Sequence, residues 1–96
     1  MIKHIVCFKL SDPTAEAMAK CKEVLLSMRG NVPMLRDIEV GTDILRSARS
    51  YDVYLAVTLD DRAALDAYQA DEYHCSVVKK HMHAVTASSV AVDFEI

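Results

Sequence analysis

The side chains that could do chemistry near neutral pH are few, and the histidines are the most informative of them. His74 falls in the first turn of an expected helix, where the positive end of the helix dipole disfavours an imidazolium and favours the neutral base. A neutral imidazole on an apolar helix face can take a proton from the carbon beside a carbonyl group. His4 falls among the apolar positions of an expected strand, which places it under the helices. The sequence thus indicates acid–base chemistry as the first candidate.

Other chemistries lack their sequence signatures. The cysteines are odd in number and widely spaced, with no CxxC pair, so neither a disulfide framework nor a zinc knuckle is indicated (Cys7, Cys21, Cys75). A metal site from His4, His74 and His81 is conceivable, but the spacing of a histidine motif with a carboxylate is missing. No Ser-His-Asp order, glycine-rich phosphate loop or cysteine nucleophile motif is present. Cys75 is expected on another side of the helix from His74.

Length and composition indicate one small globular domain. The chain has 96 residues, of which 52% are hydrophobic and 26% charged, a balance typical of a folded protein. The net charge of −3, with Lys and Arg scattered among acids, argues against a nucleic-acid-binding role. No apolar run approaches the roughly 18 residues that span a membrane, and the first residues predict a strand instead of a signal peptide. We therefore expect a cytoplasmic protein with reduced thiols.

Hydrophobic periodicity predicts four strands and three helical segments to position these groups. Asp12-Pro13 is a helix start signal and Gly30 a stop, with an apolar stripe at spacings of three and four between them. Asp60-Asp61 is interpreted as the cap of a short helix that ends near Tyr68. Strands are expected over residues 2–10, 35–40, 52–59 and 88–96, and a third helix over 74–85. In that helix four residues are expected to share one face (His74, Val78, His81, Val85). His81 and His83 lie late in the helix and are interpreted as solvated or C-terminal helix residues.

This order, β-α-β-β-α-β with a split second helix, predicts an α+β domain of ferredoxin-like plan with a four-stranded antiparallel sheet. Helices on one face leave the other face of the sheet to be covered. Apolar or small residues occupy that second parity as well (Ile5, Cys7, Tyr54, Ala56). A two-fold copy of the same sheet solves the problem, and it would help a chain whose own core is small. We expect a homodimer.

A set of short motifs in matching order runs through the whole chain and resembles the stress-responsive A/B barrel (Dabb, dimeric α/β barrel) family. The set comprises the opening MIKHIV, the Val32-Pro33 turn followed by Glu39-Val40-Gly41, the Ala67-Tyr68-Gln69 run followed by His74, and the closing Val92-Asp93-Phe94-Glu95. On this resemblance residues 1–96 are identified as a single domain of that family.

The resemblance implies site residues. The family includes plant stress-induced proteins and a plant polyketide cyclase that forms olivetolic acid from a linear tetraketide. That cyclase pairs a Tyr and a His six residues apart, which correspond to Tyr68 and His74, and an N-terminal-strand His corresponds to His4. The family often has His-Pro where this chain has Asp71-Glu72, which changes the charge beside the pocket and puts any carried-over substrate in doubt.

Further candidates follow from the expected elements and the family. Leu25 of the first helix and Leu55 of the third strand are, with His4, candidates for lining a substrate pocket. Some family members bind magnesium through backbone carbonyls, which would fall on three residues here (Arg29, Val32, Leu35). No organic cofactor is expected.

Three functions remain open at this level. The first is a pocket between sheet and helices that binds a small carbonyl-bearing metabolite, with His74 as general base and Tyr68 as hydrogen-bond donor in cyclase- or lyase-type enolate chemistry. The second is a non-enzymatic stress-response or interaction domain, in which a Tyr–His hydrogen bond merely satisfies a polar core. The third is cofactor-free oxygenation, known among related dimeric barrels. A shared fold does not choose among them.

Overall fold

The computed structural model describes residues 1–96, which form one antiparallel sheet and one layer of helices. The elements follow in the order β1 (Ile2–Leu10), α1 (Ala15–Leu26), β2 (Asp37–Thr42), β3 (Val53–Leu59), α2 (Arg62–Ala70), a π-helical segment (His74–Lys79), α3 (Lys80–Val85) and β4 (Thr86–Glu95). The predicted β-α-β-β-α-β order is confirmed. The α2–α3 region is the split second helix.

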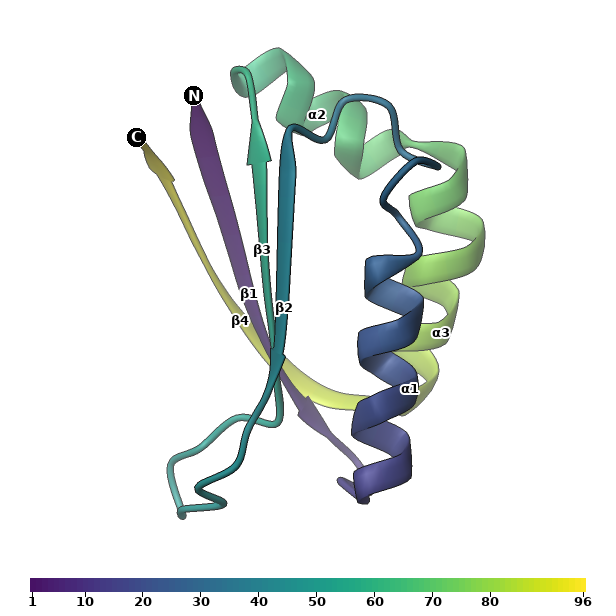
Figure 1. The fold of residues 1–96 in the computed structure, drawn as a ribbon, viewed down its shortest axis with the longest axis vertical. Coiled ribbons are helices and arrows are strands. Elements are labelled where there is room, and N and C mark those ends of the chain that lie inside the picture. Colours follow the sequence, from purple (N-terminus) through teal and green to yellow (C-terminus); the bar gives the residue numbers. More distant parts are fainter.

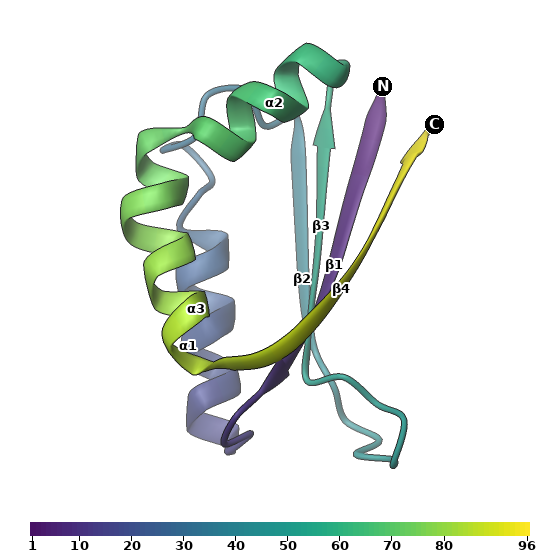
Figure 2. The same ribbon diagram turned by 180° about the vertical axis from the view of Figure 1, so that it is seen from behind.

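The sheet has the strand order β2-β3-β1-β4, with all neighbours antiparallel. The two central strands are β1, from the first half of the chain, and β3, from the second half, as the ferredoxin-like plan requires. The register sets His4 of β1 between Val57 of β3 and Asp93 of β4. All helices lie on one side of the sheet, and the ribbon leaves its other side bare (Figures 1 and 2).

The core lies between the sheet and this helical layer. Thirteen buried residues form one hydrophobic cluster, with side chains from β1, α1, the connection from α1 to β2, β2, β3, α2 and the long helical stretch before β4 (Leu10, Cys21, Leu25, Met28, Val32, Ile38, Val53, Leu55, Val57, Leu59, Tyr68, Val78, Met82). β4 contributes nothing to the cluster, and Figure 2 shows it curving away from the helices toward the C-terminus. The helices therefore cover the sheet from β2 to β1 and leave β4 open.

The face of the sheet turned away from the helices carries an apolar patch on β1 and β4. Ile5 and Cys7 lie on it opposite Val92 and Val90 of β4, as the pairing of the strands requires. Val92 is 60% exposed and Phe94, on the same face, 41%. The predicted apolar residues on the second face of the sheet are thus present, and they extend onto β4. No helix in the chain is long and apolar enough to span a membrane.

Several predicted boundaries are wrong by about one turn or less. Thr14, and not Asp12, caps α1: its side chain accepts a hydrogen bond from the backbone N–H of Ala17, at 3.0 Å. The helix ends at Leu26, before Gly30, which lies in the following turn at φ +85°. That left-handed backbone is one that glycine adopts without strain. The second strand runs over Asp37–Thr42 instead of the predicted 35–40. Asp61 caps α2 as predicted.

The third helix differs from prediction in its winding. Residues His74–Lys79 form a π-helix, and only Lys80–Val85 continue as α-helix. The buried residues recur at a spacing of four, at His74, Val78 and Met82, so Met82 takes the place on the inner face that was predicted for His81. A π turn closes i→i+5 hydrogen bonds and winds more slowly than an α turn. The alignment of side chains after it therefore departs from the 3.6-residue period.

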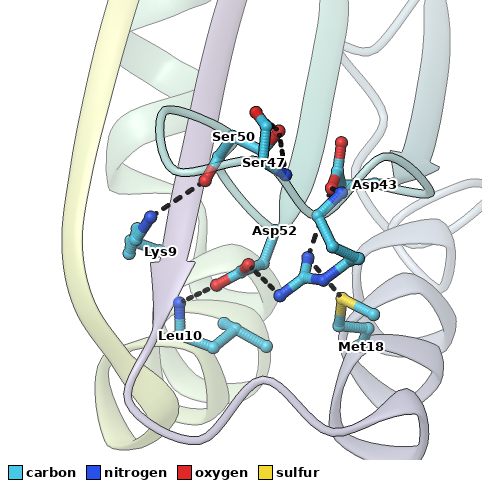
Figure 3. Close-up of polar contacts among 8 residues, drawn as sticks. Lys9, Leu10, Met18, Asp43, Ser47, Ser50 and Asp52 are labelled. Carbon is cyan, nitrogen blue, oxygen red and sulfur yellow. Dashed lines mark hydrogen bonds and ion pairs between the residues drawn. The ribbon is translucent and has the colours of Figure 1, made fainter.

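A polar network anchors the loop between β2 and β3 (Figure 3). Asp52 is 2% exposed, and its carboxylate accepts a hydrogen bond from the backbone N–H of Leu10, at 2.7 Å. The same carboxylate pairs with the Arg46 guanidinium at 2.8 Å, and Lys9 donates to the carbonyl of Ser50 at 2.9 Å. Arg46 has a left-handed backbone, at φ 55°. Side-chain contacts therefore hold this loop in place.

Candidate functional site

A cavity of about 240 Å³ lies between the helical layer and the β1–β4 half of the sheet. All five residues predicted for catalysis and substrate contact line it (His4, Leu25, Leu55, Tyr68, His74), together with nine others (Val6, Phe8, Gln69, Val78, Lys79, Met82, His83, Ser89, Ala91). Its volume is just below the range of about 300–1,000 Å³ for common ligand pockets, so it fits a small molecule. The fold thus brings together residues from His4 to Ala91, which are 87 positions apart in sequence.

His74 is buried at the start of the helical stretch that follows α2. Asp71 fixes this start, because its carboxylate accepts a hydrogen bond from the backbone N–H of His74 at 2.9 Å. The imidazole Nδ1 lies 2.9 Å from the backbone carbonyl oxygen of Tyr68. A carbonyl only accepts, so Nδ1 carries the hydrogen and the neutral ring keeps a lone pair on Nε2.

Burial is the main cause that lowers the pKa of His74, and the positive charge of Lys79 acts in the same direction. The hydrogen bond to the Tyr68 carbonyl and the negative charge of Asp71 oppose the shift. The neutral form that the sequence predicted is therefore favoured, but burial, and not the helix end, is the first cause. Asp71 also supplies the helix cap in the position where the chain departs from its family's His-Pro.

Tyr68 is fully buried, and its ring stacks on that of His74 with ring centroids 4.1 Å apart and an interplanar angle of 23°. Its hydroxyl has one partner within the protein, the thioether sulfur of Met28 at 3.8 Å. Burial, with a smaller contribution from Asp71, raises the pKa of the phenol, so Tyr68 is a neutral donor and not a phenolate. The hydroxyl of Tyr68 does not bond an imidazole, as it would in the purely structural core considered above.

His4 of β1 contacts the ring of Tyr68. Its ring meets that of Tyr68 edge to face, with ring centroids 5.8 Å apart, and its Nδ1 is paired with the carboxylate of Asp93 on β4. The carboxylate fixes the orientation of the imidazole, as acidic residues do for catalytic histidines. His4 was expected either to orient His74 or to hold a ligand group. Its partner is Asp93, so it does not bond His74.

Both imidazoles leave Nε2 without a hydrogen-bond partner in the protein. The only buried side-chain nitrogen or oxygen that lacks a partner is Thr86 Oγ1, so neither Nε2 is sealed inside packed side chains. The Nε2 atoms of two histidines whose rings contact the Tyr68 ring are therefore open to a ligand. This arrangement can bind a polar group and exchange protons with it.

Four polar lining residues were not predicted for the site: Gln69, Lys79, His83 and Ser89. Lys79 is half-buried, and its Nζ donates to the backbone carbonyl of Gln69 at 3.0 Å. His83 was interpreted as solvated; it is exposed but borders the cavity. Asp93 was also missed as the partner of His4. Its place opposite His4 in the strand register was the signal that could have found it.

The residues predicted for a magnesium ion, Arg29, Val32 and Leu35, surround a separate surface hollow. The Val32 carbonyl accepts a hydrogen bond from the backbone N–H of Leu35, at 3.2 Å, and two arginines, Arg29 and Arg36, also line the hollow. Two guanidinium groups suit a divalent cation poorly. No three His, Cys, Asp or Glu side chains lie together as metal ligands either. Magnesium stays a prediction, and the chemistry below does not use it.

Comparison with known proteins gives a family and a set of similar folds. The family model described as the stress responsive A/B barrel domain matches residues 2–96. No functionally curated protein matches the chain. Among solved structures, a dimeric ferredoxin-like protein of unknown function from Thermobifida fusca is 26% identical, with a TM-score of 0.84 over 99% of this chain and 90% of that one.

Two enzymes share the fold at lower identity. A hydroxynitrile lyase from Passiflora edulis is 14% identical, with a TM-score of 0.81 over 99% of this chain and 92% of that one. An antibiotic biosynthesis monooxygenase is 19% identical, with a TM-score of 0.73 over 100% of this chain and 98% of that one. At these identities the likeness establishes the fold alone.

Proposed function

Because this chain belongs to the stress responsive A/B barrel family, as the sequence motifs predicted, we propose that it binds a small carbonyl compound in the cavity between sheet and helices and catalyses proton transfer at the carbon beside the carbonyl. His74 is the general base and Tyr68 the hydrogen-bond donor to the developing enolate. The reaction class is lyase- or cyclase-type chemistry that proceeds through an enolate and uses no organic cofactor.

The proposed steps follow the tautomers and charges of the site. The Nε2 lone pair of His74 takes the α-proton, the electron pair of the C–H bond forms the carbon–carbon double bond of the enolate, and the π pair of the carbonyl moves to its oxygen. The hydroxyl hydrogen of Tyr68 turns from the Met28 sulfur to that oxygen. This exchange is easy, because sulfur at 3.8 Å is a weak acceptor. The protonated His74 then returns the proton to a carbon or to a leaving group.

The observation that carries the proposal is the unpartnered Nε2 of a buried, neutral His74 beside a cavity. A polar core built only for stability satisfies its groups with each other. Here the hydroxyl of Tyr68 has only a thioether and the imidazole only a backbone carbonyl. The groups with unused hydrogen-bonding capacity are those that a ligand would meet.

Deuterium exchange tests the proposal without knowledge of the natural substrate. Acetophenone and cyclohexanone exchange their α-hydrogens slowly in D2O, and proton NMR follows the exchange. The wild-type protein should accelerate exchange of at least one of them, and His74→Gln should lower the rate by about 10²–10⁴-fold, the usual contribution of a general base.

His81→Gln is the matched control, since His81 is a partly exposed histidine of the same helical stretch that does not line the cavity. It should exchange at the wild-type rate. Circular dichroism of both variants would show that they are folded. Equal exchange rates for wild type and His74→Gln would remove this residue from its proposed role.

We also propose that the apolar outer face of the sheet packs on a second copy of the chain. The support is the exposure of Val90, Val92 and Phe94 on a face that no helix covers, and the dimeric state of the similar Thermobifida fusca protein. Light scattering should give twice the chain mass of 10.7 kDa at micromolar concentration. Val92→Glu should give monomers, whereas Lys80→Glu on the helical side should not. A wild-type monomer would contradict the proposal.

A further inference from the structure

We propose that the cavity selects carbonyl compounds that carry a carboxylate, and that Lys79 is the residue that recognises this anion. The inference rests on the proposed function, whose substrate class it narrows. It starts from the charges of the lining. Four of the 14 lining residues are basic, His4, His74, Lys79 and His83, and none is acidic. The chain as a whole carries a net charge of −3, so the basic lining of the cavity is opposite in character to the net charge of the chain.

Two acidic residues near the cavity, Asp71 and Asp93, do not change the positive character of its lining. Asp93 is committed to the Nδ1 of His4, and Asp71 accepts from the backbone N–H of His74 as a helix cap. Neither carboxylate lines the cavity. A ligand in the cavity therefore meets imidazoles and an ammonium group with no carboxylate among the lining side chains, which favours a negatively charged ligand.

Lys79 is the one permanent cation among these groups, and it is held in place. Its Nζ donates to the Gln69 carbonyl at 3.0 Å, which uses one of its three hydrogens and leaves two for a ligand. Its charge reaches the centre of the site, since it contributes to lowering the pKa of His74. His83 lies four residues further along the same helical stretch, and Ser89 of β4 also lines the cavity.

The π-helical winding is what brings Lys79 and His83 to the cavity. In a regular α-helix, five residues turn the chain by about 500°, so a residue five positions after His74 would point about 140° away from it. The slower π turn between His74 and Lys79 reduces that angle, and both side chains line the same cavity as His74. Such segments are frequent at functional sites.

Three ketones of one shape test the inference. 4-Acetylbenzoate carries the anion, 4-acetylbenzamide replaces it with an uncharged group of similar size, and acetophenone lacks the group. Dissociation constants from NMR titration should be about tenfold or more lower for the benzoate than for the benzamide, the effect of one charged hydrogen bond. Lys79→Gln should abolish this preference while retaining a donor for the Gln69 carbonyl.

Lys80→Gln is the matched control, because Lys80 is the exposed neighbour that does not line the cavity, and it should retain the full preference. Equal affinity for benzoate and benzamide, no binding of either, or an unchanged preference in Lys79→Gln would each overturn the inference. Exchange at the α-carbon separates this outcome from the proposed function. Acetophenone exchange that depends on His74 would sustain the proton-transfer chemistry even if the anion preference were absent.

Discussion

Tyr68→Phe distinguishes a catalytic hydroxyl from a structural one, because the two roles predict opposite effects on stability. The substitution removes one oxygen atom from a fully buried ring and leaves the stacking on His74 and the contact with His4 in place. The hydroxyl has a single protein partner, the Met28 sulfur at 3.8 Å. Its loss therefore breaks one weak hydrogen bond and removes one buried polar group.

The two contributions can be compared. A well-formed hydrogen bond contributes about 0.5–1.5 kcal/mol net, and a long bond to sulfur lies at the bottom of that range. Burying a hydroxyl without a good partner costs about 1–3 kcal/mol by protein mutational data. We expect the free energy of unfolding to stay within about 0.5 kcal/mol of wild type or to rise by about 1 kcal/mol. Ketone exchange should fall by about 10²–10³-fold, as it does when one oxyanion donor is lost.

Urea denaturation at a fixed protein concentration measures the stability, since association would make it concentration-dependent. Tyr73→Phe is the matched control: the hydroxyl of Tyr73 donates to Ser27 Oγ at 2.7 Å, so its loss should destabilise the protein by about 1 kcal/mol. The reasoning is refuted if Tyr68→Phe lowers the free energy of unfolding by more than about 2 kcal/mol while exchange is retained. The hydroxyl would then be structural.

Two further predictions concern the loop anchor and pH. Asp52→Ala should lower the free energy of unfolding by about 2–4 kcal/mol in urea denaturation, because it leaves the Leu10 N–H and the half-exposed Arg46 without their buried partner. A loss under about 0.5 kcal/mol would show that the loop has another anchor. The lowered pKa of His74 means that the unfolded chain binds a proton there more readily than the folded one, so stability should fall as pH drops below the ordinary histidine value, about 6.5. His74→Gln should lose that part of the pH dependence, and the acid limb of wild-type exchange should lie below pH ~6.5; an acid limb above it would contradict the favoured neutral form.

The sequence predicted the sheet well, and it identified side chains that line the cavity, because both depend on patterns with a short repeat. Strand alternation placed His4 on the helical side and Ile5 and Cys7 on the other, and the pairing of β1 with β3 and β4 agrees with both. Boundaries were less accurate where two residues compete for one role. Asp12 and Thr14 are both good caps, and only the fold decided for Thr14.

The rim of the site could not be predicted, because its residues are aligned by the π turn. The 3.6-residue period places His81 on the inner face and His83 away from it, which is what the sequence analysis concluded. The slower winding moves Met82 inward and brings Lys79 and His83 to the cavity. No composition signal marks such a turn in HCSVVK, so the period itself was the wrong assumption there. The Asp93 partner of His4 needed the β1–β4 register, which a single strand pattern does not contain.

The π turn also has a consequence for changes in chain length at the cavity rim. An i→i+5 turn holds one residue more than the α-helical turn that it interrupts. Loss of a single codon in this segment, for instance that of exposed Ser76 or Val77, would let the helix regain its ordinary pitch. The side chains between the deletion and β4 would keep about their present directions, because the five-residue π turn and the four-residue α turn that replaces it both complete roughly one rotation. The chain could therefore lose one residue here without moving the groups at the cavity rim away from His4 and Tyr68.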